Sequence, residues 1–169
     1  MAAHGAVVLK VESRSRPGLF RLFGPYRDDT PAPFNPWLNR GGSFGLWNTG
    51  KLSLALNLAH PKGIEIAKRL VAWADIVVEN FAGGVMKRMG LGYEELKKIK
   101  PDIIMLRQSG YGSWGPYKNL PAFGMVLVPI AGLPNFIGWP GKEPLPVGVS
   151  AYTDCISPRL ASAALIAAL

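Results

Sequence analysis

The chain has 169 residues, of which 49% are hydrophobic and 18% charged, and its formal net charge is +8. This length and composition suit one globular domain with a core and exclude a disordered chain. The longest apolar run, residues 160–169, is about half of the roughly 20 residues that a membrane-spanning helix needs. The N-terminal segment lacks a signal-peptide layout. We therefore expect no membrane partner and no secretion.

The positive charge and the single cysteine narrow the partners and the compartment. The basic residues are scattered and follow no motif that reads nucleic acid. Charge alone predicts association with anions, which a phosphorylated cofactor satisfies as well as DNA would. With no reading motif, we expect no nucleic-acid partner. Cys155 excludes an internal disulfide and fits a reducing compartment, so we expect a cytoplasmic protein.

The N-terminal part is predicted to hold one strand and a long irregular segment. Gly5 closes a helical turn, and residues 6–11 have the apolar, β-branched character of a strand. Residues 13–50 are rich in Pro, Gly, Arg and aromatic side chains. Linkers rarely carry so many large apolar side chains, so we expect a packed segment whose aromatic residues serve packing.

A strand and a helix are predicted next. Apolar residues alternate with period two at 52–58, which predicts a strand with one apolar face. His60 and Pro61 then open a predicted helix at 62–73, whose apolar side chains form one stripe. We interpret His60 as a helix-entry residue.

The centre of the chain carries a predicted strand, turn and helix. Residues 76–78 form a β-branched run typical of a strand buried on both faces, and Asn80 lies at its polar end. Phe81 offers an aromatic face, and the glycines at 83–84 allow a ligand to approach the backbone closely. The helix predicted at 85–89 has unpaired amide hydrogens that attract phosphate. A strand, turn and helix that serve only the fold remain the alternative.

Two further elements complete an alternating order. An amphipathic helix is predicted at 93–100 and a buried strand at 103–106. The alternation of strands and helices predicts a parallel sheet with right-handed crossovers. Ligands of such sheets bind beyond the carboxyl ends of the strands, where residues 79–80 and 108–112 lie. No GxGxxG or P-loop pattern is present.

The C-terminal part contains one carboxylate placed for chemistry. Residues 125–131 are predicted to form a buried helix or strand, and Ser157 with Pro158 predicts a helix start. Asp154 lies a few residues before that start, where the helix field favours an ionised carboxylate that can act as a nucleophile. A role in capping the helix or satisfying loop amides stays open. Cys155, a rival nucleophile without a candidate base, is interpreted as a small buried apolar residue.

Both ends of the chain fall inside predicted elements, the turn before Gly5 and the helix after Pro158. A helix as short as the first has no independent stability. We therefore expect the chain to be part of a longer protein.

Several segments together resemble one family, the class III (CaiB/BaiF-type) coenzyme A (CoA) transferases. The resemblance covers essentially the whole chain, and its segments occur in the order of the family: residues 5–12, 51–58, 74–81, 89–93, 109–112, 115–117, 131–133, 138–140 and 151–154. It implies an α/β fold with a Rossmann-like parallel sheet and flanking helices, incomplete at both ends. Residues 1–169 would form a partial CoA-binding and catalytic domain, preceded by a first strand and helix and followed by a second domain. It also implies an interlocked homodimer and no metal ion.

The resemblance further implies a reaction and its residues. Members of the family move CoA from an acyl-CoA to a small carboxylic acid through a covalent aspartyl intermediate, and the matching aspartate is Asp154. Its carboxylate would form a mixed anhydride and then an aspartyl-CoA thioester, which the acceptor acid attacks. The positions that match the family's CoA contacts are Leu56, Asn80, Phe81, Ala82 and Arg88, with Arg14 a looser match near the phosphates.

Two positions depart from the family pattern. Ala59 replaces a lysine that some members use for CoA, and Gly124 replaces a polar or acidic residue. Racemases of CoA esters share the fold and use a histidine near position 123, followed by an acidic residue. Phe123 and Gly124 occupy these positions here, which argues against a racemase. A non-catalytic module that binds CoA or a nucleotide remains the alternative from a different class of protein.

Overall fold

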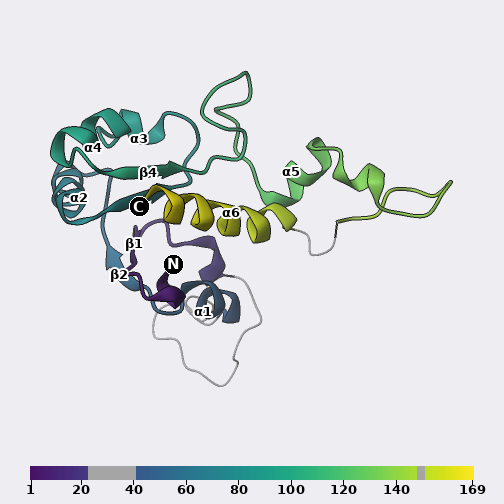
Figure 1. The fold of residues 1–169 in the computed structure, drawn as a ribbon, viewed down its shortest axis with the longest axis horizontal. Coiled ribbons are helices and arrows are strands. Elements are labelled where there is room, and N and C mark those ends of the chain that lie inside the picture. Colours follow the sequence, from purple (N-terminus) through teal and green to yellow (C-terminus); the bar gives the residue numbers. More distant parts are fainter. Residues whose placement is uncertain (23–40, 148–150) are drawn as a thin grey trace. The chain divides into compact units, whose positions relative to one another are not determined.

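The computed structural model describes residues 1–22, 41–147 and 151–169, and Figure 1 shows the path of the chain. The chain divides into two compact units, Met1–Gly63 and Ile64–Leu169, which are described one at a time. Much of the segment predicted to be irregular but packed, residues 23–40, lies outside the described residues, with four of its aromatic side chains.

The first unit is built on a two-stranded parallel sheet. Strand β1 (Leu9–Glu12) pairs with strand β2 (Leu52–Ala55). The helices of this unit are η1 (Ala2–His4), η2 (Leu19–Arg21) and α1 (Gly42–Asn48), and α2 (Pro61–Trp73) begins here. Gly5 follows η1 with a left-handed φ of 94°, so the predicted helical turn closed by Gly5 is confirmed.

The segment between β2 and α2 sets the end of one element and the start of the next. The strand predicted at 52–58 ends at Ala55, because the chain turns at Asn57, whose carbonyl accepts a hydrogen bond from the His60 amide at 3.2 Å. The Nδ1 atom of His60 accepts a hydrogen bond from the Lys62 amide at 3.2 Å. This bond satisfies an amide that has no partner inside the helix. The prediction that His60 is a helix-entry residue is confirmed.

The second unit contains the other parallel pair. Strand β3 (Ile76–Glu79) pairs with strand β4 (Ile104–Arg107). The helices of this unit are α3 (Val85–Arg88), α4 (Tyr93–Ile99), α5 (Gly124–Ile130), η3 (Leu133–Phe136) and α6 (Tyr152–Ala168). Helix α6 packs against both α5 and β4. Residues 125–131, predicted as helix or strand, are almost all in helix α5.

Few of the described apolar side chains are buried. They are Leu56 in the first unit, and Val71, Leu91, Leu96, Ile103, Val128 and Leu165 in the second. Leu96, on α4, is 1% exposed. Within residues 1–22, 41–147 and 151–169, no helix has the length and hydrophobicity needed to cross a membrane.

The strands differ from the prediction in two respects. Their parallel order is confirmed, but they form two sheets of two strands instead of one sheet. The prediction of a strand buried on both faces is wrong for β3, because Val78 is 56% exposed. A β-branched run is typical of a strand covered on both faces, whereas the described residues leave Val78 uncovered.

Helix α6 begins at Tyr152, so the prediction of a helix start at 157–158 is wrong. The carbonyl of Ala151 closes the first turn by accepting a hydrogen bond from the Asp154 amide at 2.9 Å. Pro158 lies inside the helix and removes the amide that would bond to the Asp154 carbonyl. Asp154 is therefore the third residue of α6 and does not precede the helix.

The carboxylate of Glu12 joins several polar groups of the first unit in one network of hydrogen bonds and ion pairs. Arg21 donates from Nη2 to Oε2 at 2.6 Å, and the Gly18 amide donates to Oε1 at 2.9 Å. Lys10 Nζ lies 3.0 Å from Oε1. Mainly through the hydrogen bonds from Arg21, this network lowers the pKa of Glu12 to about 2. The Lys10 and Arg21 cations also lie 5.0 and 3.8 Å from the centroid of the Phe44 ring, which ties α1 to the network.

We expect Glu12→Gln to lower the free energy of unfolding at pH 7 by about 1–3 kcal/mol, because the variant loses charge-assisted hydrogen bonds. The pKa of the carboxyl falls from 4.5 to about 2 on folding. Its stabilisation is therefore complete above pH 4.5 and is lost as the pH falls toward 2. Urea unfolding as a function of pH should show a steeper acid loss in the wild type than in the variant. Glu65→Gln, which removes an exposed carboxylate of α2, is the control, and parallel profiles for the wild type and Glu12→Gln would contradict the assignment.

Candidate functional site

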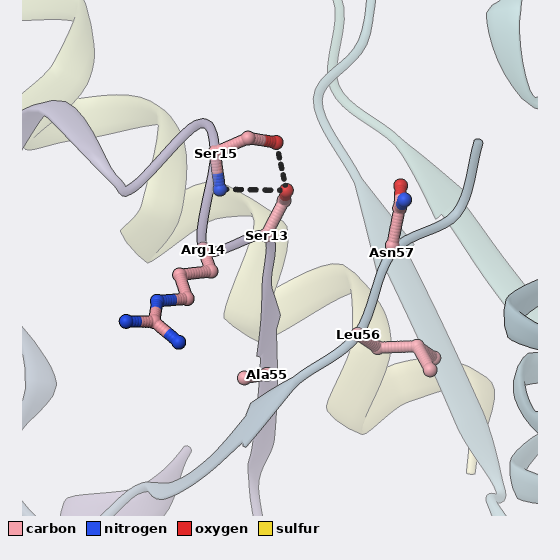
Figure 2. Close-up of a pocket in the computed structure, with 6 residues that line it drawn as sticks. All are labelled: Ser13, Arg14, Ser15, Ala55, Leu56 and Asn57. Atoms are coloured by element: carbon pink, nitrogen blue, oxygen red, sulfur yellow. Dashed lines mark hydrogen bonds between the residues drawn. The ribbon is translucent and has the colours of Figure 1, made fainter. Parts of the chain in front are cut away.

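A cavity of about 430 Å³ lies at the carboxyl ends of β1 and β2 (Figure 2). Its lining residues end these strands or follow them directly: Ser13, Arg14, Ser15, Ala55, Leu56 and Asn57. The carboxyl ends of parallel strands are the usual position of ligands in α/β proteins. Two of the predicted CoA contacts, Arg14 and Leu56, are brought together in this cavity.

Arg14 and Leu56 contribute different surfaces to the cavity. Leu56 is buried, and its amide extends the sheet by donating to the Glu12 carbonyl at 2.8 Å. Arg14 is exposed, and Figure 2 shows its side chain extending away from Leu56. The turn that carries Arg14 is held by Ser13 Oγ, which accepts a hydrogen bond from the Ser15 amide at 3.2 Å. The cavity is thus lined by an apolar side chain and an exposed guanidinium group.

The turn after β3 carries three more predicted contacts, Asn80, Phe81 and Ala82, and all three are exposed. Glu79 shapes this turn, because its Oε2 accepts a hydrogen bond from the Phe81 amide at 2.7 Å. Phe81 is 41% exposed, so part of its aromatic face is open. In the register of the β3–β4 pair, Glu79 lies opposite Arg107, the last residue of β4. The two predicted strand ends therefore lie side by side.

Arg88, the last residue of α3, lies against this turn at Gly84. Gly84 adopts a left-handed φ of 76°, and a methyl group placed on it would lie 3.2 Å from Arg88 Nη1. The guanidinium group therefore folds back over the turn. Helix α3 has only four residues, and its Val85 amide already donates to the Ala82 carbonyl at 3.2 Å. A single turn has a weak dipole, so the amides of α3 attract an anion less strongly than those of a longer helix would.

Asp154 is exposed, and its carboxylate lies against Gly124, the first residue of α5. A methyl group placed on Gly124 would lie 2.8 Å from Oδ2 of Asp154 and 2.9 Å from both Oδ1 and Cγ. Gly124 is itself buried. The bare backbone at the start of α5 is therefore the surface on which the carboxylate rests.

The carboxylate of Asp154 does not cap its helix. The N-cap residue of α6 is Ala151, and no side chain caps this end. Asp154 lies in the first turn of a 17-residue helix, where the dipole favours negative charge. Within the described parts of the chain, no hydrogen bond or ion pair reaches its side chain. Cys155, the rival nucleophile, is half-buried, so the prediction of a buried residue is wrong.

Three further residues were not predicted as individual site residues, although Ser109 lies within the predicted segment 108–112. Gly124 was recognised only as a departure from a family pattern, because no local signal reports its contact with Asp154. Ser109 and Thr153 each have a buried hydroxyl group without a hydrogen-bond partner. Such groups are uncommon in folded proteins. Ser109 follows β4, and Thr153 precedes Asp154.

A second cavity of about 320 Å³ lies in the first unit, and no predicted site residue lines it. Its lining residues are Lys10, Arg21, Phe44, Asn48, Lys51, Leu52 and Ser53. Burial and the charge of Lys10 lower the pKa of Lys51. Lys10 and Arg21 are already paired with Glu12, so this cavity belongs to the network that holds the unit together. The described residues contain no group of His, Cys, Asp or Glu side chains arranged to hold a metal ion.

The fold is that of an α/β protein with a cavity at the carboxyl ends of one parallel strand pair. The chain belongs to CoA-transferase family III, whose sequence model matches residues 1–169. The predicted resemblance and the α/β fold class are thereby confirmed.

Known relatives cover nearly the whole chain. The succinyl-CoA–L-malate CoA-transferase β subunit of Chloroflexus aurantiacus is 37% identical over 152 residues, which are 89% of this chain and 35% of that protein. The succinyl-CoA:glutarate CoA-transferase of Homo sapiens is 36% identical, over 98% of this chain and 35% of that protein. The crystal structure of a CAIB/BAIF family protein from Brucella suis matches with a TM-score of 0.78 at 33% identity, over 96% of this chain and 42% of that one. The chain thus spans less than half the length of these relatives.

Proposed function

We propose that the protein is an acyl-CoA:carboxylate CoA-transferase in which Asp154 is the nucleophile. The observation that carries this proposal is the state of the Asp154 carboxylate. It is exposed in the first turn of α6, and no described residue makes a hydrogen bond or an ion pair with it. A carboxylate without structural partners is available to attack a substrate. The names of the relatives support an acyl-CoA donor and a small carboxylic acid as acceptor.

The chemistry proceeds through four acyl transfers. An oxygen of Asp154 attacks the thioester carbonyl of the donor, the carbon–sulfur bond breaks, and a mixed anhydride and CoA thiolate form. The thiolate then attacks the aspartyl carbonyl and releases the donor acid, which leaves an aspartyl-CoA thioester. The acceptor carboxylate attacks this thioester and gives CoA thiolate and a second mixed anhydride. The thiolate then attacks the acceptor carbonyl of that anhydride, which releases the new acyl-CoA and restores the Asp154 carboxylate. A third carboxylate splits the exchange into steps of similar free energy, provided that water is excluded.

The proposed CoA contacts are the positions that match those of the family. These residues are Arg14 and Leu56 in the first unit, and Asn80, Phe81, Ala82 and Arg88 in the second. The exposed face of Phe81 suits stacking against adenine. The Arg88 guanidinium, folded over the Gly84 turn, suits a phosphate group.

Trapping the covalent intermediate tests the nucleophile. The full protein is incubated with succinyl-CoA and hydroxylamine, which converts an activated aspartyl group into a stable hydroxamate. We expect mass spectrometry of the digested protein to locate the hydroxamate on Asp154, and only when the acyl-CoA is present. Binding of CoA without any hydroxamate would instead support the non-catalytic CoA-binding module. A hydroxamate confined to another carboxylate would overturn the role of Asp154.

We expect Arg88→Gln to weaken CoA binding by about tenfold, the loss of one charge-assisted contact of about 1.4 kcal/mol. Isothermal titration of the full protein with CoA measures the change. Arg69→Gln, which removes an exposed arginine of α2, is the matched control and should leave the affinity unchanged. If both variants weaken binding equally, the effect of Arg88 is one of general charge and not of contact.

The racemase reading gains no support at the position where its base would lie. Phe123 is the N-cap residue of α5 and is 60% exposed, and its side chain cannot accept a proton.

We also propose that the chain forms part of the CoA-binding and catalytic domain of a longer protein that assembles as a homodimer. The share of the relatives that it covers, 35% to 42%, supports the first part of this proposal.

A further inference from the structure

We propose that Gly124 is a positioning residue for the reaction. The absence of its side chain leaves a space, called the seat below, in which the Asp154 carboxylate lies and which fixes its position. This inference rests on the proposed function of Asp154 as nucleophile. It assigns the seat to a residue on another helix, far from Asp154 in the sequence.

The seat is defined by shape and not by hydrogen bonds. All three atoms of the carboxylate group lie within 2.9 Å of the point that a methyl group on Gly124 would occupy. Gly18 and Glu12 offer a contrast within the same chain. There a carboxylate also approaches a glycine, but the glycine amide donates to it at 2.9 Å. At Gly124 no described hydrogen bond holds the carboxylate, so the contact there is one of shape.

The seat is rigid on the glycine side and movable on the aspartate side. Gly124 is buried in α5, and Val128, also buried, anchors the same helix. The carboxylate is the far end of an exposed side chain that can rotate about χ1. A methyl group at position 124 therefore displaces the carboxylate and leaves the helix in place. Misplacement of a reacting group by about 1 Å can slow a reaction by about 10²-fold.

The first test compares the rate of acylation in two glycine variants of the full protein. We expect Gly124→Ala to form the Asp154 hydroxamate from succinyl-CoA at least about tenfold more slowly. The affinity for CoA should stay within about twofold of the wild type, since a positioning residue acts on the chemical step. The matched control is Gly45→Ala in α1, where an added methyl group meets nothing within 4 Å.

The outcomes separate this inference from the proposed function. If Gly124→Ala is acylated at the rate of the wild type, Gly124 does not position the carboxylate, and Asp154 remains the nucleophile. Absence of the hydroxamate in the wild type overturns the nucleophile. In that case the crystal structure of Gly124→Ala still decides the seat, since an Asp154 carboxylate in its original position would refute it.

A further variant covers the case in which Gly124→Ala does not fold. Combining it with Asp154→Ala removes the carboxylate that the methyl group would meet. We expect the double variant to fold with the melting temperature of Asp154→Ala alone, because the two positions are directly coupled. A double variant that still fails to fold would show that the methyl group meets something other than the carboxylate, and the proposal would be wrong.

Discussion

Asp154→Asn should lower kcat for CoA transfer by at least about 10³-fold, because an amide oxygen is a far weaker nucleophile than a carboxylate. The substitution keeps the shape of the side chain, so the contact with Gly124 is retained. No described hydrogen bond to the side chain is lost. The stability should therefore fall by at most about 1 kcal/mol, the favourable interaction of a negative charge with the α6 dipole. Steady-state kinetics with succinyl-CoA and an acceptor acid, alongside thermal unfolding, measure both effects.

Two further variants make the Asp154 result specific. Asp102→Asn removes an exposed carboxylate of the second unit in the same way and should leave turnover unchanged. Cys155→Ala removes the neighbouring thiol and should also leave the acylated residue unchanged. If Asp154→Asn keeps more than about a tenth of the turnover, less than about 1.4 kcal/mol of transition-state stabilisation is lost, and Asp154 is not the nucleophile. Loss of turnover only in Cys155→Ala would transfer the role to the thiol.

Local signals were sufficient where a few adjacent residues decide the structure. Helix α4 ends at Ile99 because Pro101 disfavours a helical conformation at the residue before it. Helix α2 was predicted to within one residue from Pro61 and its apolar stripe. Helix α1 was not predicted, since its seven residues include two glycines. Its Phe44 ring lies under the cations of the Glu12 network, which is a tertiary contact that no local pattern reports.

The geometry around the predicted site residues could not be predicted from the sequence. Pro158 is a common helix-start signal, yet α6 begins earlier, at Tyr152, and contains Pro158 in its interior. The prediction therefore placed Asp154 before the helix and not within its first turn. The contact between Asp154 and Gly124 joins two helices and depends on the absence of a side chain. A sequence shows that a glycine is present, but it does not show which group occupies the space above it.

Gly63→Ala should be strongly destabilising for so small a substitution, with a loss of about 3 kcal/mol in the free energy of unfolding. Gly63 is buried at the third position of α2. A methyl group there would lie 1.9 Å from the carbonyl oxygen of Asn57 and 2.8 Å from its carbonyl carbon. Both atoms belong to the backbone, so the clash cannot be relieved by rotating a side chain. The turn between β2 and α2 would have to move.

The same displacement should reach the first cavity, because Asn57 and Leu56 line it. We therefore expect Gly63→Ala to lower the melting temperature by several degrees and to weaken CoA binding together. Gly45→Ala is the matched control, since an alanine in open space within a helix is expected to stabilise by about 0.5–1 kcal/mol. A melting temperature of Gly63→Ala equal to that of the wild type would mean that α2 and the Asn57 turn do not approach as closely as described. Reduced stability with unchanged CoA affinity would instead separate the turn from the ligand, and Leu56 would lose its proposed role.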